Sequence, residues 1–269
     1  MSVRPDRYIF MADKDSPEMA DAKILMTVLD LTLPRTCSVC GDRLLSFERH
    51  ICTECLADIP FTFNWNLPHN PMADRFNERI QNTVYQGAKH QQTKNGHIPY
   101  CYATSLFFFN SEARYRKIPY AIKYYGDTPL GYFFGRMLGE RIAASPEFSD
   151  VDMIIPVPLY WSRKWKRGYN QAEVIARGIA RSLPAEVRTD ILSRRRHTKT
   201  QTRLSVEGKA ANVKSAFRSV KKVPPDIRHI LLVDDVFTTG ATLNACWQAL
   251  RLAVNGARVS IATLAMVSN

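Results

Sequence analysis

The sequence of 269 residues has no apolar run long enough to cross a bilayer. A clear run such as Leu106–Phe109 falls far short of the roughly 20 apolar residues that a membrane-spanning helix needs. A signal-peptide pattern is also missing, because the first residues include acidic and basic side chains. Internal repeats and low-complexity segments are absent as well. We therefore expect a soluble, cytoplasmic, globular protein and no membrane insertion.

Acidic residues are scarce in one segment of the chain. Residues 151–222 contain 17 of the 37 lysines and arginines but 5 of the 25 aspartates and glutamates. This segment therefore carries the whole net charge of +12, and the rest of the chain is neutral. Such a patch can neutralise a pyrophosphate group, a nucleic-acid backbone or both. A solvated basic face without a ligand is the more general explanation and stays open at this point.

Cysteines are few, but four of the six form two Cys-x-x-Cys pairs separated by eleven residues. This spacing can close a tetrahedral, four-thiolate zinc site of the ribbon type. Disulfides are a weaker explanation in a chain without a secretory signal, and a redox role is weaker because one metal accounts for both pairs. Four sulfur ligands leave no position for a catalytic water, so we predict a structural zinc ion. Its ligands are Cys37, Cys40, Cys52 and Cys55.

Apolar periodicity predicts the alternating strands and helices of an α/β domain. Strands are expected at residues 100–109, 153–158, 186–192, 230–233 and 258–266. Helices are expected at residues 22–33, 112–124, 130–143, 172–183 and 243–254. The stretch 61–99 contains prolines and few periodic apolar residues, and we expect it to be irregular.

The strand expected at 230–233 ends in two adjacent carboxylates, Asp234 and Asp235. A short hydroxyl-rich loop then leads into the helix expected from residue 243. This places the loop at the carboxyl end of a strand and the amino end of a helix, where open α/β sheets bind ligands. Helix N–H groups and hydroxyls favour an anion there, and the carboxylates suit vicinal sugar hydroxyls or a hydrated metal ion. The hydroxyls belong to Thr238, Thr239 and Thr242. An ordinary turn with solvated acids is the simpler alternative.

A second polar loop follows the strand expected at 153–158 and precedes another helix. Its cations are Arg163, Lys164, Lys166 and Arg167. They would attract a pyrophosphate, and Gly168 would allow close approach of the backbone. Trp161, Trp165 and Tyr169 alternate with the cations, a pattern that also suits stacking of single-stranded bases. Packing of either tryptophan on the domain surface is an equally good explanation.

The region around residues 230–242 resembles the phosphoribosyl-diphosphate (PRPP) motif of type I phosphoribosyltransferases. From about Leu29 to the carboxyl end, the chain resembles the ComF family of competence-associated proteins, also called GntX-like. The other motifs are Leu29-Asp30-Leu31, Ile122-Lys123-Tyr124-Tyr125-Gly126-Asp127, Ile155-Pro156-Val157-Pro158-Leu159, Arg167-Gly168-Tyr169-Asn170-Gln171-Ala172, and Arg194 with Thr200, Gln201, Leu204, Asn212 and Phe217. Many relatives carry further cysteines after the first ribbon, whereas here Cys101 is the next cysteine, so no second zinc is expected.

The resemblance implies an α/β fold, a type I phosphoribosyltransferase-like doubly wound parallel sheet with a small amino-terminal zinc-ribbon module. It implies that Asp234 and Asp235 are catalytic residues that hold the ribose hydroxyls. The 5-phosphate would be bound by Thr238, Thr239, Gly240, Ala241 and Thr242. The loop 158–168 would hold the pyrophosphate with Mg²⁺, and the segment 194–201 would close over it. The substrate-binding residues of these two segments are Arg163, Arg167, Gly168, Arg194 and Lys199.

We expect four parts along the chain. They are a tail with a short amphipathic helix (1–33), the zinc ribbon (34–60), a linker (61–99) and the phosphoribosyltransferase-like domain (100–269). Two functions are compatible with them. One is a phosphoribosyltransferase, a glycosyltransferase acting on PRPP with Mg²⁺. The other is a non-catalytic single-stranded DNA-binding protein of DNA uptake and natural competence that keeps the fold. The acceptor stays open, because no segment presents an obvious base-reading hood.

Overall fold

The computed structural model describes residues 34–88, 100–194, 216–251, 253–254 and 256–268. The helix expected at 22–33 and residues 195–201 of the segment expected to close over the pyrophosphate lie outside the described residues. None of the helices in the described ranges has both the length and the apolar character needed to cross a bilayer.

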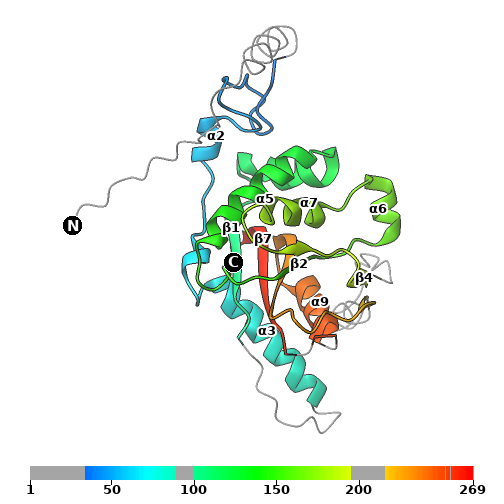
Figure 1. The fold of residues 1–269 in the computed structure, drawn as a ribbon. Coiled ribbons are helices and arrows are strands. Elements are labelled where there is room, and N and C mark those ends of the chain that lie inside the picture. Colours follow the sequence, from blue (N-terminus) through cyan, green and yellow to red (C-terminus); the bar gives the residue numbers. More distant parts are fainter. Residues whose placement is uncertain (1–33, 89–99, 195–215, 252, 255, 269) are drawn as a thin grey trace, which may run out of the picture.

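A five-stranded parallel sheet forms the centre of the molecule, with the strand order β1-β7-β6-β2-β3 (Figure 1). Its strands are β1 (Ala103–Phe109), β2 (Met153–Pro156), β3 (Glu186–Val187), β6 (His229–Phe237) and β7 (Arg258–Val267). A second, antiparallel sheet consists of β4 (Leu192–Arg194) and β5 (Phe217–Ser219). The parallel sheet confirms the expected α/β class.

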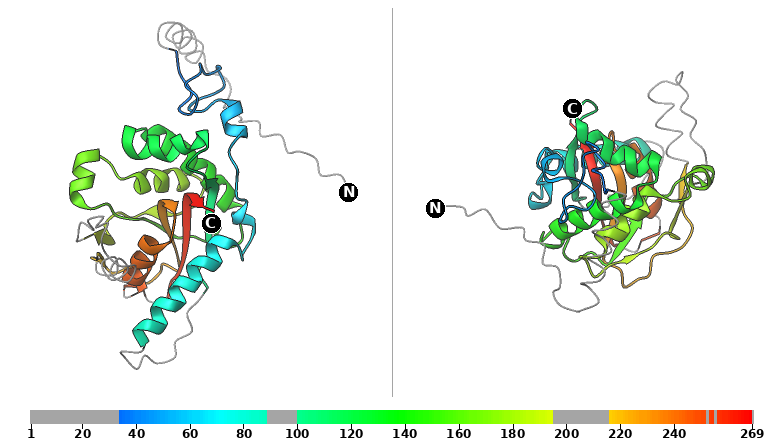
Figure 2. Two further views of the ribbon diagram at one scale, coloured as in Figure 1. Left: turned by 180° about the vertical axis from the view of Figure 1, so that it is seen from behind. Right: turned by 90° about the horizontal axis from the view of Figure 1, so that it is seen from above.

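Helices cover both faces of the parallel sheet (Figures 1 and 2). One face is covered by α5 (Thr128–Ala143) and α7 (Gln171–Ile179), and the other by α3 (Pro71–Ala88) and α9 (Ala241–Arg251). Within β6, Leu231 and Val233 belong to the first of these cores, whereas Ile230 and Leu232 belong to the second. Because both faces are buried, the central strands are continuous apolar runs without polar alternation.

Helices α5 and α7 pack against each other with their backbones in close approach. A Cβ atom at Gly135 would lie 2.4 Å from the carbonyl oxygen of Ile175, and one at Gly178 would lie 2.5 Å from that of Tyr132. Larger residues would therefore force the helices apart, since backbone atoms cannot move aside as a side chain can. This contact fixes the position of α7, whose first residue is Gln171.

The segment expected to be irregular, 61–99, contains the 18-residue helix α3, so that expectation was wrong. Pro71 is its first residue, where proline is favourable because the N–H group would have no helical partner. Asn70 Oδ1 accepts hydrogen bonds from the next two N–H groups, at 3.1 and 3.0 Å. Met72, Phe76 and Ile80 follow at helical spacing and are buried against the sheet.

Three other elements differ from their predicted boundaries. The helix expected at 112–124 is divided into η2 (Arg114–Arg116), α4 (Lys117–Tyr120) and the π-helical turn η3 (Ala121–Tyr125). Pro119 explains the break, because it lacks the N–H group that a regular helix would use there. The strand expected at 186–192 is split, since β3 pairs with β2 and β4 pairs with β5. The loop expected at 158–168 contains the helix α6 (Trp161–Arg167).

The chain before α3 forms a small ribbon at one end of the molecule (Figure 1). It contains the bridge Thr36↔Arg43 and the helix α2 (Thr53–Ala57). The chain then passes along the outer edge of β1, where Phe61 bridges to Phe107, and forms the turn η1 (Asn64–Asn66). This crossing covers the free edge of β1, which would otherwise expose unpaired backbone groups.

Candidate functional site

The two predicted ligand segments follow the neighbouring strands β2 and β6. Their pairing runs from Met153↔Ile230 to Pro156↔Val233. After β2 the chain continues to α7 on one face of the sheet, and after β6 it continues to α9 on the other face. Where neighbouring strands diverge in this way, a crevice opens outside their carboxyl ends, and α/β proteins bind ligands there. The fold thus places the two segments at a common edge.

Asp234 and Asp235 lie within β6, and the expectation that the strand ends at residue 233 was wrong. β6 continues to Phe237 because it remains paired with β7 up to Phe237↔Met266. On its other side, the pairing with β2 stops at Pro156, which has no N–H group to donate. The acid pair therefore occupies the part of β6 that extends beyond β2.

The two carboxylates of the acid pair have different surroundings. Asp235 is 8% exposed, and its Oδ2 atom lies 3.4 Å from Nε2 of Gln171 and 3.9 Å from Nζ of Lys123. Burial, followed by the negative charge of Asp235, raises the pKa of Asp234 well above its ordinary value. Hydroxyl donors or a hydrated cation would relieve the repulsion in this pair, so the site is suited to ligands that bring them.

A three-residue loop, Thr238–Gly240, connects β6 to α9. Gly240 has a φ of +71°, and a Cβ atom there would lie 2.9 Å from the ring of Phe237. Oγ1 of Thr239 accepts a hydrogen bond from the backbone N–H of Ala241 at 3.4 Å. The exposed or partly exposed residues of the segment are Thr238, Thr239, Ala241 and Thr242. The first N–H groups of the 11-residue helix have no carbonyl partner within the helix, and together with the neighbouring hydroxyls they can form a cradle for an anion.

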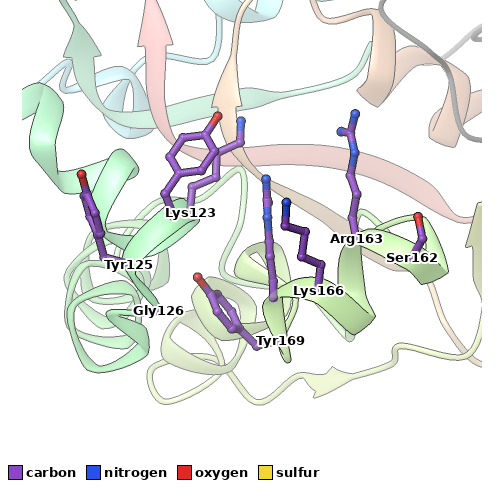
Figure 3. A pocket seen from close by; sticks show the side chains of 9 residues that line it. Lys123, Tyr125, Gly126, Ser162, Arg163, Lys166 and Tyr169 are labelled. Atoms are coloured by element: carbon purple, nitrogen blue, oxygen red, sulfur yellow. The ribbon is translucent and has the colours of Figure 1, made fainter.

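A cationic cavity of about 840 Å³ opens beside the acid pair. Lys123 extends into it from η3, and Arg163 and Lys166 extend into it from α6 (Figure 3). Its lining residues are Lys123, Tyr124, Tyr125, Gly126, Ser162, Arg163, Lys166, Arg167 and Tyr169. This lining, as far as the structure describes it, has four cationic side chains and no carboxylate. The ligand class that it favours is an anion with several charges.

Gln171 connects the cavity to the acid pair. Arg167 donates a hydrogen bond from Nη1 to Oε1 of Gln171 at 3.2 Å, and Nε2 of Gln171 approaches Asp235. Gly168, just before this contact, has a φ of +79° and open space where a Cβ would lie. Its conformation favours glycine, but no atom of the described residues crowds it.

Arg194 extends the cationic side toward the acid pair from the end of β4. Burial and the charge of Arg163 lower the pKa of its guanidinium group, while Asp234 acts in the opposite direction. The guanidinium carbon lies 5.0 Å from the ring centroid of Phe217 on β5. Lys199, the other residue predicted for this segment, lies outside the described residues.

Lys123 and Gln171 are members of the site to which the sequence assigned no role. Lys123 Nζ and the guanidinium carbon of Arg167 lie 5.7 and 5.4 Å from the ring centroid of Tyr124, so both cations contact the same aromatic ring. Lys123 belongs to the π-helical turn η3, a type of irregularity that is frequent at functional sites. The available signal was the Lys-Tyr-Tyr-Gly run, but its distance of more than 100 residues from Asp235 hid the contact.

Helix α6 also settles how its tryptophans are placed. Trp161 and Trp165 lie one helical turn apart and are 66% and 88% exposed. The alternative in which they pack on the domain surface is therefore wrong. They alternate along the helix with Arg163 and Lys166, which line the cavity, whereas the two tryptophans are not among its lining residues.

The four predicted zinc ligands come together in the ribbon. The Sγ atoms of Cys37, Cys40, Cys52 and Cys55 all lie within 4.8 Å of one another. The Cys40 and Cys52 sulfur atoms are 3.7 Å apart, close to the roughly 3.8 Å set by tetrahedral Zn–S bonds of about 2.3 Å. Burial opposes ionisation of Cys37, but backbone N–H donors lower its pKa to about 7. Gly41, with a φ of +89°, forms the turn after the first pair. The cluster fits a structural zinc ion.

Comparison with known proteins supports the phosphoribosyl transferase fold of the carboxyl-terminal part of the chain. Residues 170–268 match the family model described as phosphoribosyl transferase domain. Competence protein F of Haemophilus influenzae is 45% identical over 101 residues, which cover 37% of this chain and 44% of that protein. DNA utilization protein YhgH of Escherichia coli O157:H7 is 39% identical over 99 residues, covering 37% and 43%. Competence protein ComFC of Streptococcus pneumoniae is 29% identical over 122 residues, covering 45% and 50%.

These matches span half or less of each of these relatives. The residues that match the family model nevertheless include α7, the acid pair, the anion cradle and strand β7. The cluster of four cysteines identifies the ribbon on the amino-terminal side of this domain. Sequence likeness and tertiary structure thus agree on an α/β phosphoribosyl transferase domain with an amino-terminal zinc-ribbon module, and the chain is similar to competence proteins of the ComF type.

Proposed function

We propose that this protein binds PRPP or a related ribose phosphate together with Mg²⁺ and transfers its phosphoribosyl group. The observation that supports this proposal is the position of the acid pair of β6 between an anion cradle and a cationic cavity. A ribose that carries phosphate at one end and diphosphate at the other presents hydroxyls between two anionic groups. The site has the matching order, with hydroxyl-binding carboxylates between two anion-binding parts.

Each part of such a ligand has a matching group in the site. Asp234 and Asp235 would accept hydrogen bonds from the ribose hydroxyls, and the segment 238–242 would hold the 5-phosphate. The diphosphate would occupy the cavity, where Lys123 and Arg163 supply positive charge from opposite walls. Mg²⁺ bound with the diphosphate would neutralise more of its charge and so make it a better leaving group.

The transfer would be a substitution at C1 of the ribose. The acceptor forms a bond to C1 while the bond from C1 to the diphosphate oxygen breaks, and the electron pair leaves with the diphosphate. Catalysis would come from holding the ribose in position and from stabilising charge on the leaving group. Lys123 is well placed for this, because it lies in the cavity and 3.9 Å from the carboxylate of Asp235.

Titration calorimetry with PRPP and Mg²⁺ tests the proposal. We expect saturable binding by the wild-type protein. Asp235→Asn should lose at least about tenfold in affinity, because asparagine has nearly the same shape as aspartate but lacks the charge of the acceptor. Asp226→Asn, at an exposed position before β6, is the matched control and should bind normally. A wild-type protein that does not bind, or an Asp235→Asn variant that binds as tightly as wild type, would refute the proposal.

Binding of single-stranded DNA is a second candidate function. The exposed tryptophans of α6 and the cations beside them favour it, since bases stack on aromatic rings while cations neutralise phosphates. The names of the relatives, competence protein and DNA utilization protein, also support a role in DNA uptake. On this proposal the phosphoribosyl transferase fold is kept as a binding scaffold, with or without catalysis.

The DNA proposal predicts that Trp165→Ala weakens binding of an oligonucleotide by about fivefold or more, as expected for loss of one stacked base. Phe47→Ala, which removes an aromatic side chain of the ribbon that is 72% exposed, is the control and should have no effect. Fluorescence anisotropy at several salt concentrations measures both variants. An affinity that does not depend on salt, or equal effects of the two substitutions, would contradict the proposal.

A further inference from the structure

The first cysteine pair of the ribbon contacts the wall of the cavity through two hydrogen bonds. Ser38, which lies between Cys37 and Cys40, donates from Oγ to Oδ2 of Asp127 at 3.0 Å. Lys117 of α4 donates from Nζ to the carbonyl oxygen of Val39 at 2.6 Å. Both contacts join residues about 80 to 90 positions apart in the sequence, and both end on the turn formed by residues 37–41.

Asp127 uses its two carboxylate oxygens for two different elements. Oδ2 accepts from Ser38, whereas Oδ1 accepts from the backbone N–H of Leu130 at 3.0 Å and so caps α5. The preceding residue, Gly126, has a φ of +76° and lines the cavity. The turn 126–127 therefore connects the cavity wall, helix α5 and the ribbon.

The cavity wall on this side has little regular structure of its own. It is formed by the π-helical turn η3, which carries Lys123 and is followed directly by the positive-φ glycine. Turns of this kind are held in place by the contacts around them. One such contact comes from Tyr169, whose hydroxyl donates to the carbonyl oxygen of Ile122. The ribbon supplies another contact, through Asp127.

The ribbon is seated firmly enough to act as a support. Its buried residues, which include Val39 and Ile51, belong to the same apolar core as α5 and α7. The rings of His50 and Phe133 of α5 have centroids 5.5 Å apart. Figure 1 shows the ribbon next to α5, at the end of the molecule away from α3 and α9. A metal bound by four cysteines would make the turn 37–41 rigid.

We propose that the ribbon positions the cavity wall, with Ser38 as the positioning residue. Through its hydrogen bond to Asp127, Ser38 holds residues 121–127 in the conformation that directs Lys123 into the cavity. The affinity of the cavity for a diphosphate therefore depends on the ribbon, which lies far from the acid pair. That the ligand is a diphosphate rests on the proposed function, whereas the effect of the ribbon on the conformation of residues 121–127 does not. A ribbon that only stabilised the fold would change global unfolding and leave this segment unaffected in the folded protein.

Hydrogen–deuterium exchange of residues 121–130 tests the hold of the ribbon. In Ser38→Ala we expect exchange in this segment to become roughly tenfold faster, as for loss of one hydrogen bond to a charged group, while exchange in residues 229–237 is unchanged. Ser46→Ala, an exposed serine of the same ribbon, is the matched control. Zinc content is measured for each protein. Lys117→Met changes no residue of the cysteine turn but removes the hydrogen bond from α4 to Val39, and it decides the question if Ser38→Ala loses its metal. Unchanged exchange in the variant that keeps its zinc would overturn the proposal.

Titration with inorganic pyrophosphate and Mg²⁺ tests the consequence for the cavity. We expect Ser38→Ala to bind about three- to tenfold more weakly than wild type and Ser46→Ala to bind normally. A variant with faster exchange at 121–130 but wild-type affinity would overturn the link to ligand binding. If the wild-type protein binds neither pyrophosphate nor PRPP, the proposed function fails, and the exchange measurement alone then supports or overturns the positioning role.

Discussion

The two ends of strand β6 both hold buried polar side chains, but their charges are satisfied to different degrees. At the amino end, Nδ1 of His229 lies 2.7 Å from Oδ1 of Asp150, and its Nε2 lies 2.8 Å from Oγ of Ser260. Arg258 contacts both oxygens of Asp150, at 2.6 and 2.7 Å. Every polar atom of the histidine ring thus has a partner. This network is closed.

The carboxyl end of β6 has two adjacent carboxylates with fewer compensating charges. Lys123 lies 3.9 Å from Asp235, and burial with like charge raises the pKa of Asp234. The difference shows which polar cluster is available for a ligand. The order Ser260, His229 and Asp150 has the contacts of a hydrolase triad, but Ser260 is 0% exposed and no substrate can reach it. A closed network stabilises the fold, whereas a pair of carboxylates with partial charge compensation can bind donors and cations.

The largest effect is expected when the closed network is broken. His229→Ala should lower the free energy of unfolding by about 3 kcal/mol, because it leaves the buried hydroxyl of Ser260 without this partner and a cavity in the core. PRPP affinity of the folded variant should remain that of the wild type, since the change lies at the other end of β6. Urea unfolding and calorimetry measure the two quantities. His69→Ala, at an exposed histidine, is the control. Loss of affinity in folded His229→Ala would show that the two ends are not independent.

The next largest effect compares the two positive-φ glycines of the ligand segments. Gly240→Ala should lower the free energy of unfolding by about 2 kcal/mol and weaken PRPP binding, because its Cβ would meet the ring of Phe237. Gly168→Ala should cost about 1 kcal/mol, the cost of its φ alone, since space is open there. Thermal unfolding and titration of both variants measure the difference. Equal costs would mean that crowding at Gly240 does not contribute.

A smaller effect of opposite sign is expected at the acid pair. Asp234→Asn should raise the free energy of unfolding by about 1 kcal/mol at neutral pH while it weakens PRPP binding. The raised pKa means that the native state holds a proton more tightly than the unfolded state, so stability is lost as pH rises from about 4 through the native pKa. The advantage of the variant should therefore disappear in acid. Denaturant unfolding at pH 4 and 7 measures it, and a destabilised variant at pH 7 would contradict the comparison.

The smallest effect concerns the pH response of His229. Burial, the largest influence, lowers its pKa, while the hydrogen bond to Asp150 acts in the opposite direction. The unfolded state therefore binds protons more readily, and stability should fall as pH drops below about 6.5. The difference in the free energy of unfolding between wild type and His229→Gln should shrink by less than about 1 kcal/mol between pH 7 and 5.5. A difference that stays constant would show that His229 does not titrate in this window.

Local sequence patterns were sufficient to predict many of the helices and strands of this molecule and its cysteine cluster. The cysteine spacing predicted the four-sulfur cluster, and apolar runs with helical stripes predicted α5, α7, α9 and the central strands. Local patterns failed where strand pairing or helix capping sets the boundary of an element. Helix α3 was missed because Pro71, usually a helix breaker, is its first residue and Asn70 caps it. The end of β6 was misplaced because pairing with β7 carries the strand through Asp234 and Asp235.

The sequence by itself determined which chemical groups this protein presents. The acid pair, the hydroxyl loop, the basic segment and the four cysteines are all readable because each lies in a short, continuous stretch. Only the tertiary structure decided which of these groups meet. Lys123 reaches Asp235, and Ser38 reaches Asp127, across separations of about 90 residues or more. The physical reason is that parallel strands and packed helices join distant segments, and no local pattern encodes which ones become neighbours.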